Sequence, residues 1–401
     1  MSGFIGQLLN NYFCMKQPKI AFVKQEIYQD LYVCSKEEKN AANILFSSQM
    51  RVGPIGLMAE LNADFIIVKE EYNRETQLYR KVIPSIAKYL YILKTQTADK
   101  MPGSSSVIVP GSIHANGEYA ISCYDIDWSV YDIVISINIS LPTTLILKYP
   151  NVLFAYMIGE ANFPIRSAFW GYDVSLNQEA NGKIATNGGN VEFPYTFLKG
   201  NTLEKIICNH LNRPSKKSGV YMEINSTKER PVTTVPPHFE PLVKHGYPIN
   251  LHHQNIADNL VELYDSKYFV KMGGRKIRGN SVAEAISAGV LAIMNRDEII
   301  HKQLIIDECN VKTIEDVINL LEFLDNNPDT YKSLLNKQRK LVDDLFFEAP
   351  LKSLINSLEY KRKCNHHHSL FDKTKDIIVL WCISFYMYLK QQKKYIKKFL
   401  K

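Results

Sequence analysis

Several features that define whole classes of protein are missing from this sequence of 401 residues. Its seven cysteines are scattered, odd in number and lack C-x-x-C spacing. This pattern argues against a disulfide scaffold or a cysteine-based zinc site and favours a reducing compartment. No G-x-G-x-x-G follows the first predicted strand, which argues against a dinucleotide-binding fold. The remaining expectation is an ordinary globular chain.

Long apolar segments are also scarce. The first 17 residues have no basic region followed by a long apolar stretch, so no signal peptide or membrane anchor is expected and the interpretation is cytoplasmic. Residues 377–389 form an uncharged run of thirteen residues, about 20 Å as a helix and too short for a hydrocarbon core of roughly 30 Å. Six lysines follow it, which predicts an interfacial helix on an anionic membrane surface. The alternative is a C-terminal helix that packs back onto the N-terminal domain.

Composition and length predict two domains with substantial cores, because 46% of the residues are hydrophobic. The expected divisions are residues 1–205, residues 206–350, and a helical, basic tail over 351–401. The net charge of +7 is concentrated in that tail, and no nucleic-acid recognition module accompanies it, so nucleic acid is not an expected partner.

Apolar runs alternate with helical patterns along both predicted domains. Strands are predicted at 19–23, 43–46, 64–68, 107–109, 132–137, 152–157, 219–224, 268–272 and 290–294. Helices are predicted at 53–61, 79–93, 314–326 (opened by Thr313) and 329–346, with Pro350 ending the last helical region. Strands that alternate with helices predict an α/β fold with parallel, doubly wound sheets, which bind ligands at the carboxyl ends of their strands.

A basic glycine turn precedes the most informative helix. Asn280 and Ser281 are N-cap residue types, Glu284 lies one turn into the helix, and Gly289 fits the position that ends it. Helix N-termini beside glycines and cations bind phosphate groups, and an acidic residue one turn later suits a sugar hydroxyl. The candidate donor-binding residues here are Lys271, Gly273, Gly274, Arg275, Arg278, Asn280, Ser281 and Glu284. The alternative is a helix–strand pair of an ordinary α/β domain.

The segment from Glu284 to Ile293 reads E-A-I-S-A-G-V-L-A-I and resembles the donor site of GT-B glycosyltransferases, E-A-x-x-x-G-x-x-x-I. The resemblance implies two Rossmann-like domains facing across a cleft, with the nucleotide sugar on the C-terminal domain. Many retaining members carry a second glutamate in an E-x₇-E motif. The corresponding position here is Lys276, so the expectation is an inverting enzyme.

A second resemblance, to the fucosyltransferase and exostosin-type families, covers about half of the chain. It is carried by F-A-Y-M-I-G-E ending at Glu160, by G-Y-D-V-S-L around Asp173, by Phe193-Pro194, and by a stretch ending at Arg230. It implies that Arg230 lies near the donor diphosphate and that Glu160 is the general base. Independently, a carboxylate that follows an apolar strand faces the ligand edge of the sheet, where desolvation raises its basicity.

Other groups remain as alternatives. Asp173, His114 and His238 are reserve candidates for the base, each also explained by a structural role. Asp125-Ile-Asp127 has the D-x-D form that binds metal–nucleotide complexes in another glycosyltransferase fold, although such a triplet is frequent by chance. The GT-B resemblance implies that arginines, lysines and helix dipoles take the place of a metal, so no metal site and no required cofactor are expected.

These patterns predict an inverting hexosyl- or deoxyhexosyltransferase of class EC 2.4. Its substrates would be a nucleotide sugar and a glycan or lipid-linked acceptor, at the cytoplasmic membrane face. Two alternatives stay open: a non-catalytic, membrane-associated binding protein with a GT-B-like fold, and another α/β enzyme acting on a nucleotide or phosphosugar.

Overall fold

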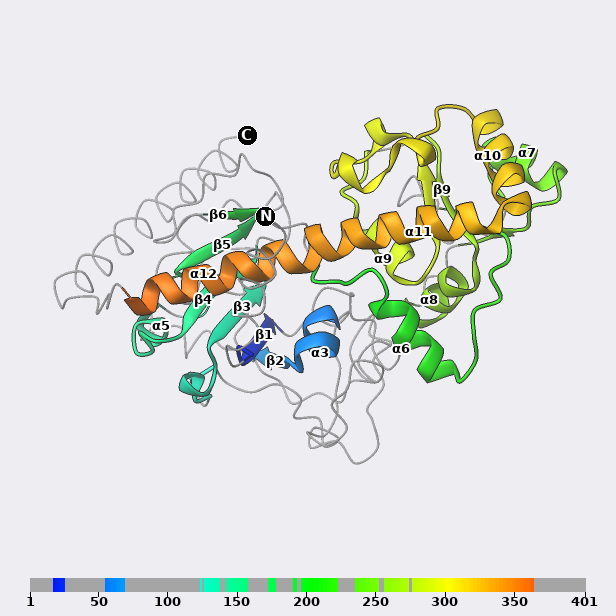
Figure 1. Ribbon diagram of the computed structural model, residues 1–401. Coiled ribbons are helices and arrows are strands. Elements are labelled where there is room, and N and C mark those ends of the chain that lie inside the picture. The colour runs from blue at the N-terminus through cyan, green and yellow to red at the C-terminus, as the bar shows by residue number, and fades with distance from the viewer. Residues whose placement is uncertain are drawn as a thin grey trace, which may run out of the picture.

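The computed structural model describes residues 17–25, 55–68, 123–124, 126–137, 141, 143–157, 172–177, 190–192, 196–222, 235–251, 256–273 and 276–363. They form an α/β protein with two parallel sheets and helices packed against them (Figure 1). The predicted elements at 43–46, 79–93 and 107–109 lie outside the described residues.

The first sheet has six parallel strands in the order β2-β1-β3-β4-β5-β6. The strands are β1 (Ile20–Gln25), β2 (Asp64–Val68), β3 (Ile133–Ile137), β4 (Leu153–Met157), β5 (Val174–Asn177) and β6 (Asn190–Glu192). β2 lies on one side of β1 and β3 on the other, so the chain reverses direction across the sheet between β1 and β3. This strand order confirms the doubly wound α/β class expected from the sequence.

Alternate residues of these strands enter two different cores, as the pleat of a strand requires. Ala21 and Val134 pack in one core with α5 (Thr143–Ile146) and the buried Trp128. Ile20 and Ile133 face the opposite way, into a core that we call the α12-side core because three leucines of helix α12 complete it. Burial on both faces explains why the strands read as continuous apolar runs.

The second sheet has four parallel strands in the order β10-β9-β7-β8. They are β7 (Val220–Met222), β8 (Ile249–Asn250), β9 (Tyr268–Lys271) and β10 (Leu291–Met294). Around them lie α6 (Thr202–Leu211), α7 (Glu240–Lys244), α8 (Ile256–Asp265), α9 (Asn280–Ser287), α10 (Ile314–Asn326) and α11 (Pro328–Asp343). Their apolar side chains form one large second-sheet core. Thr313 opens α10 through a capping box with Asp316, at the position predicted from the sequence.

The edge of β10 is closed by a buried side chain from α11. Gln338 donates to the backbone oxygen of Ala292 at 2.8 Å and accepts from the Ala292 N–H at 3.0 Å. Both residues are fully buried. The amide of Gln338 therefore pairs the strand edge as another strand would, and it joins α11 to the sheet.

The prediction that Pro350 ends the last helical region is wrong. α11 continues through a π-helical turn, Asp344–Glu348, into α12 (Ala349–Lys363), and the rod crosses from the second sheet to the first (Figure 1). Pro350 has no N–H to donate to the carbonyl four residues earlier, that of Phe346. The structure gives that carbonyl another donor, the N–H of Leu198 at 3.2 Å.

The π-helical turn also distributes two neighbouring aromatic residues between the halves of the protein. Phe346 packs in the second-sheet core and Phe347 in the α12-side core. The linker before α6 does the same with Phe197 and Leu198, in the opposite order. Two chain crossings, joined by the Leu198–Phe346 hydrogen bond, thus connect the two cores.

No helix among the described residues is long and apolar enough to cross a membrane. The predicted interfacial segment at 377–389 and its lysines lie outside those residues.

Candidate functional site

The carboxyl edge of the second sheet carries most of the described candidate residues. β8 lies on one side of β7 and β9 on the other, so the strand order reverses between β7 and β9. Lys271 is the last residue of β9, beside this reversal, and the chain from it to α9 is the basic glycine turn. Parallel α/β sheets bind their ligands at such a position.

The backbone of Gly279 starts α9. Its φ is +124°, and a Cβ at this position would lie 3.3 Å from the side chains of Ile299 and Leu304. Gly279 is therefore the N-cap, one residue earlier than predicted from the polar side chains that follow it. Gly289, at φ +83°, follows the end of the helix, as predicted.

Three candidate residues lie on the first turns of α9. Asn280 is its first helical residue, Ser281 follows, and both are half-buried. The side-chain oxygen of Asn280 is buried, and within the described part of the chain it has no hydrogen-bond partner. Glu284, also half-buried, lies one turn further on. Arg278, directly before Gly279, is half-buried as well, so the structure brings these four side chains to one helix start.

The ammonium group of Lys271 is engaged within the protein. It donates to a carboxylate oxygen of Glu298 at 2.7 Å and to the backbone oxygen of Gly273 at 2.6 Å. The Lys271 side chain is fully buried. The sequence did not single out Glu298, although the polar run Asn295–Glu298 directly after the buried strand β10 is a signal that could have found it.

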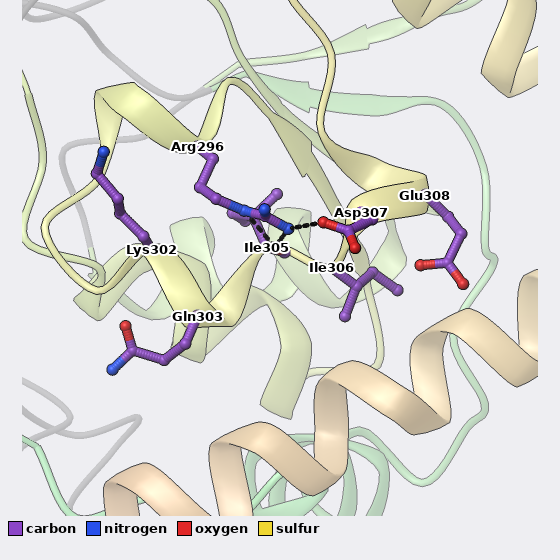
Figure 2. Close-up of a pocket in the computed structure, with 7 residues that line it drawn as sticks. All are labelled: Arg296, Lys302, Gln303, Ile305, Ile306, Asp307 and Glu308. Atoms are coloured by element: carbon purple, nitrogen blue, oxygen red, sulfur yellow. Dashed lines mark hydrogen bonds and ion pairs between the residues drawn. The ribbon is translucent and has the colours of Figure 1, made fainter.

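A surface hollow of about 590 Å³ lies next to this edge, beyond β10 (Figure 2). It is lined by Arg296, Lys302, Gln303, Ile305, Ile306, Asp307 and Glu308. The guanidinium of Arg296 donates to the Ile305 carbonyl at 2.5 and 2.9 Å and to Asp307 at 2.6 Å. These bonds hold the wall of the hollow together, and sequence reasoning did not anticipate it.

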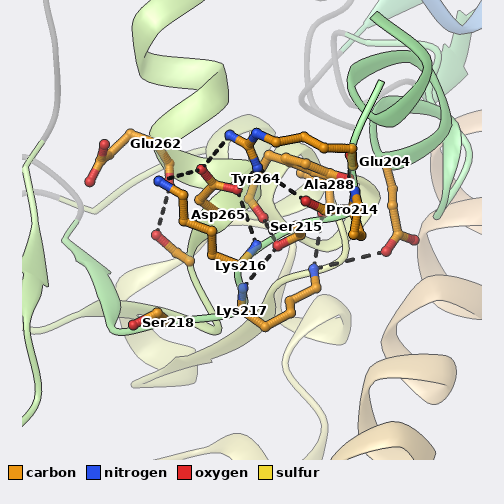
Figure 3. A network of polar contacts seen from close by, with 12 residues as sticks. Glu204, Pro214, Ser215, Lys216, Lys217, Ser218, Glu262, Tyr264, Asp265 and Ala288 are labelled. Atoms are coloured by element: carbon orange, nitrogen blue, oxygen red, sulfur yellow. Dashed lines mark hydrogen bonds and ion pairs between the residues drawn. The ribbon is translucent and has the colours of Figure 1, made fainter. Parts of the chain in front are cut away.

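The C-terminal end of α9 is fixed by a polar network (Figure 3). Lys217 donates to the backbone oxygen of Gly289 at 2.6 Å, and Glu204 lies 3.9 Å from its ammonium group. Beside it, Arg213 forms a bidentate pair with Asp265, with both distances 2.7 Å. Burial lowers the pKa of Lys217 to about 8, since desolvation disfavours the charged amine. Both ends of α9 are therefore held by groups from distant segments.

The reserve base Asp173 lies at the opposite edge of the other sheet. It directly precedes β5, and its carboxylate accepts from Lys361 of α12 at 2.8 Å and from the Phe154 N–H at 2.7 Å. These contacts tie α12 to the amino edge of the first sheet. The structure does not bring Asp173 together with the residues around α9.

His238, the other described reserve candidate, is exposed in a short 3-10 helix, Pro237–Phe239. The candidates Glu160, Arg230, Gly274, Arg275, His114 and Asp125 lie outside the described residues. Asp127 is described. It caps the 3-10 helix Trp128–Val130 by accepting from the Ser129 N–H at 3.0 Å. Its carboxylate also accepts from the Ser129 hydroxyl, and the hydroxyl bond and the N–H bond both lower the pKa of the Asp127 carboxyl. Across the described ranges, histidines, cysteines and carboxylates form no cluster able to hold a metal ion.

No protein-family model matches the chain, and no curated protein matches it significantly. The two parallel sheets, and the helix start at the carboxyl edge of the second, are therefore the basis for any conclusion about function.

Proposed function

We propose that this protein is a glycosyltransferase of GT-B architecture. It transfers a sugar from a nucleotide diphosphate donor to a glycan or lipid-linked acceptor, with inversion. One observation carries the proposal: Lys271 at the end of β9 and the start of α9 lie at the carboxyl edge of the second parallel sheet, beside its strand reversal. That is the place where an α/β sheet binds a nucleotide.

The chemistry of this helix start suits a diphosphate. Backbone N–H groups and the positive end of the helix dipole face an anion there, and Arg278 adds a cation. The departing nucleoside diphosphate gains charge in the transition state, so fixed positive groups at this point accelerate its loss. Glu284, one turn further on, has the spacing for a hydroxyl of the ribose or sugar. Asn280 and Ser281 supply further polar contacts.

The acceptor hydroxyl requires a base. Glu160 is the proposed base, because in the sequence it comes three residues after the end of the buried strand β4. Asp173, at the amino edge and bonded to Lys361, is the weaker choice. The proposed cellular site remains the cytoplasmic face of a membrane, with residues 377–401 as the attachment.

The first test is a thermal-shift screen of the intact protein against nucleotide sugars and their free nucleoside diphosphates, followed by calorimetric affinity measurements with the best donor. We expect Arg278→Ala and Glu284→Ala each to weaken donor binding by about tenfold to a hundredfold. Losing a charge-assisted contact costs roughly 1.5–3 kcal/mol.

Two control variants separate direct contact from general effects. Lys276→Ala removes a positive charge from an exposed position in the same turn, and Glu315→Ala removes a carboxylate from the exposed face of α10. Both controls should keep the donor affinity within about twofold. Equal losses in controls and test variants, or no stabilisation by any nucleotide, would contradict the proposal. Slow donor hydrolysis without acceptor would separate an enzyme from a non-catalytic binding protein.

A further inference from the structure

The carboxylate of Glu298 bonds to the glycine turn through both of its oxygens. One of its oxygens accepts from the Lys271 ammonium at 2.7 Å, and the other accepts from the Gly273 N–H at 3.0 Å. Lys271 in turn donates to the Gly273 carbonyl at 2.6 Å. Both backbone groups of Gly273 are thus bonded to the same ion pair, which fixes the path of the chain as it leaves β9.

Backbone bonds extend this frame toward α9. The Ile277 N–H donates to the Glu298 carbonyl at 2.9 Å, and the Ile277 carbonyl accepts from the Ile300 N–H at 2.9 Å. The segment of Glu298 is itself fixed, since Asn295 caps its 3-10 helix by accepting from the Asp297 N–H. The chain on the far side of β10 therefore determines where the turn and the start of α9 lie.

Burial makes the ion pair interdependent. The Lys271 side chain is fully buried and that of Glu298 is about one-fifth exposed. Removing one partner leaves the other as an uncompensated buried charge, whereas removing both is far less costly. A donor phosphate could reach the Lys271 ammonium only if the groups around it moved, because the Lys271 side chain is fully buried.

We propose that Lys271 and Glu298 are positioning residues: they shape the turn that binds the donor diphosphate, and neither contacts the donor. This assignment rests on the proposed function for its consequence in donor binding, but the shape of the turn can be tested without any nucleotide. It also assigns the direct phosphate contacts to Arg278 and the start of α9.

The first experiment is hydrogen exchange of the nucleotide-free protein, followed over residues 272–279. We expect Glu298→Gln and Lys271→Met each to raise exchange there by roughly tenfold or more, because a hydrogen bond to a charged group is lost. The double variant, which leaves no unpaired charge, should recover part of the protection and remains informative if a single variant unfolds. Asp297→Asn is the matched control, since its carboxylate is 75% exposed and pairs with Lys302 outside the turn. Unchanged exchange in both single variants and the double variant would overturn the proposal.

The second experiment measures donor affinity. A contacting role and a positioning role of Lys271 predict opposite effects of Glu298→Gln on this affinity. If Lys271 contacts phosphate, Glu298→Gln frees it and tightens binding, while Lys271→Met weakens binding and reduces its dependence on salt. For positioning residues, both substitutions weaken binding by about tenfold, the double variant is no worse than either, and the salt dependence is unchanged. Tighter binding by Glu298→Gln would refute the assignment. If neither the unmodified protein nor any variant bound a donor, while hydrogen exchange changed as expected, the proposed function would be refuted. The role of Lys271 and Glu298 in shaping the turn would still be established.

Discussion

The amide of Gln338 offers the sharpest test of how the second sheet is held together. We consider Gln338→Met, which keeps the length of the side chain and removes both hydrogen-bonding groups. The backbone N–H and carbonyl of Ala292 would then lose their bonds of 3.0 and 2.8 Å at a fully buried position. α11 should still cover the strand, because Leu334 and Leu335 before this position and Val342 after it remain in the core.

The magnitude follows from the two orphaned groups. Each buried backbone group left without a partner costs about 1–3 kcal/mol, and burying a thioether in place of an amide offsets roughly 1 kcal/mol of the total. We expect the free energy of unfolding to fall by about 1–5 kcal/mol, compared with the roughly 5–15 kcal/mol typical of a folded domain.

Urea unfolding followed by circular dichroism measures this difference. The matched control is Asn336→Met, which replaces an amide by the same side chain at an exposed position two residues earlier on α11 and should change stability by less than about 0.5 kcal/mol. If Gln338→Met lost no more stability than Asn336→Met, the strand edge would not depend on this amide and the reasoning would be refuted.

Two further predictions concern the ends of α9. Gly279→Ala should cost about 1–3 kcal/mol in thermal unfolding, because φ +124° strains an alanine and its methyl would meet Ile299 and Leu304 at 3.3 Å; Gly246→Ala, at φ +85° in open space, should cost less. Lys217 has a pKa of about 8 in the folded protein against 10.5 ordinarily, so between these values this residue binds more protons in the unfolded chain and its contribution to stability should rise with pH. The rise should be about 1–2 kcal/mol after allowance for the exposed 30% of the side chain. Lys217→Asn should abolish this rise in urea titrations across that pH range, and asparagine tolerates the backbone φ of +48° at this position. A pH dependence of stability that the substitution left unchanged would contradict the prediction.

Local patterns in the sequence sufficed where local forces determine the structure. β2 and α10 begin and end at the predicted residues, because the apolar run that follows Asp64 and the Thr313 capping box are set by neighbours within a few positions. The positive φ of Gly289 followed from the same kind of reasoning. The α/β class and the parallel order of the strands were also predictable, since strands and helices alternate along the chain.

Contacts between distant segments could not be predicted in this way. Pro350 reads as a helix end because the sequence does not reveal that Leu198 will supply the donor for the Phe346 carbonyl. Lys271 reads as a free cation because its partner, Glu298, lies 27 residues further along the chain, in the segment that follows β10. Similarly, the sequence suggests that Asp173 is an available base, whereas in the structure its carboxylate is bonded to Lys361. The partners of these charged groups are set by tertiary structure, which a local sequence pattern does not reveal.

The placement of α12 has a consequence for synthesis of the chain. Strand β1 begins at Ile20, yet the α12-side core that buries its Ile20 and Phe22 also needs Leu351, Leu354 and Leu358. A ribosome makes β1 early and α12, the helix that covers this face of the sheet, more than three hundred residues later. Until then, the apolar side chains that α12 covers are exposed, a surface of the kind that chaperones recognise and that aggregates at high concentration. The sheet that is translated first is thus the one completed last, so the N-terminal half of this protein matures only after the C-terminal half has emerged.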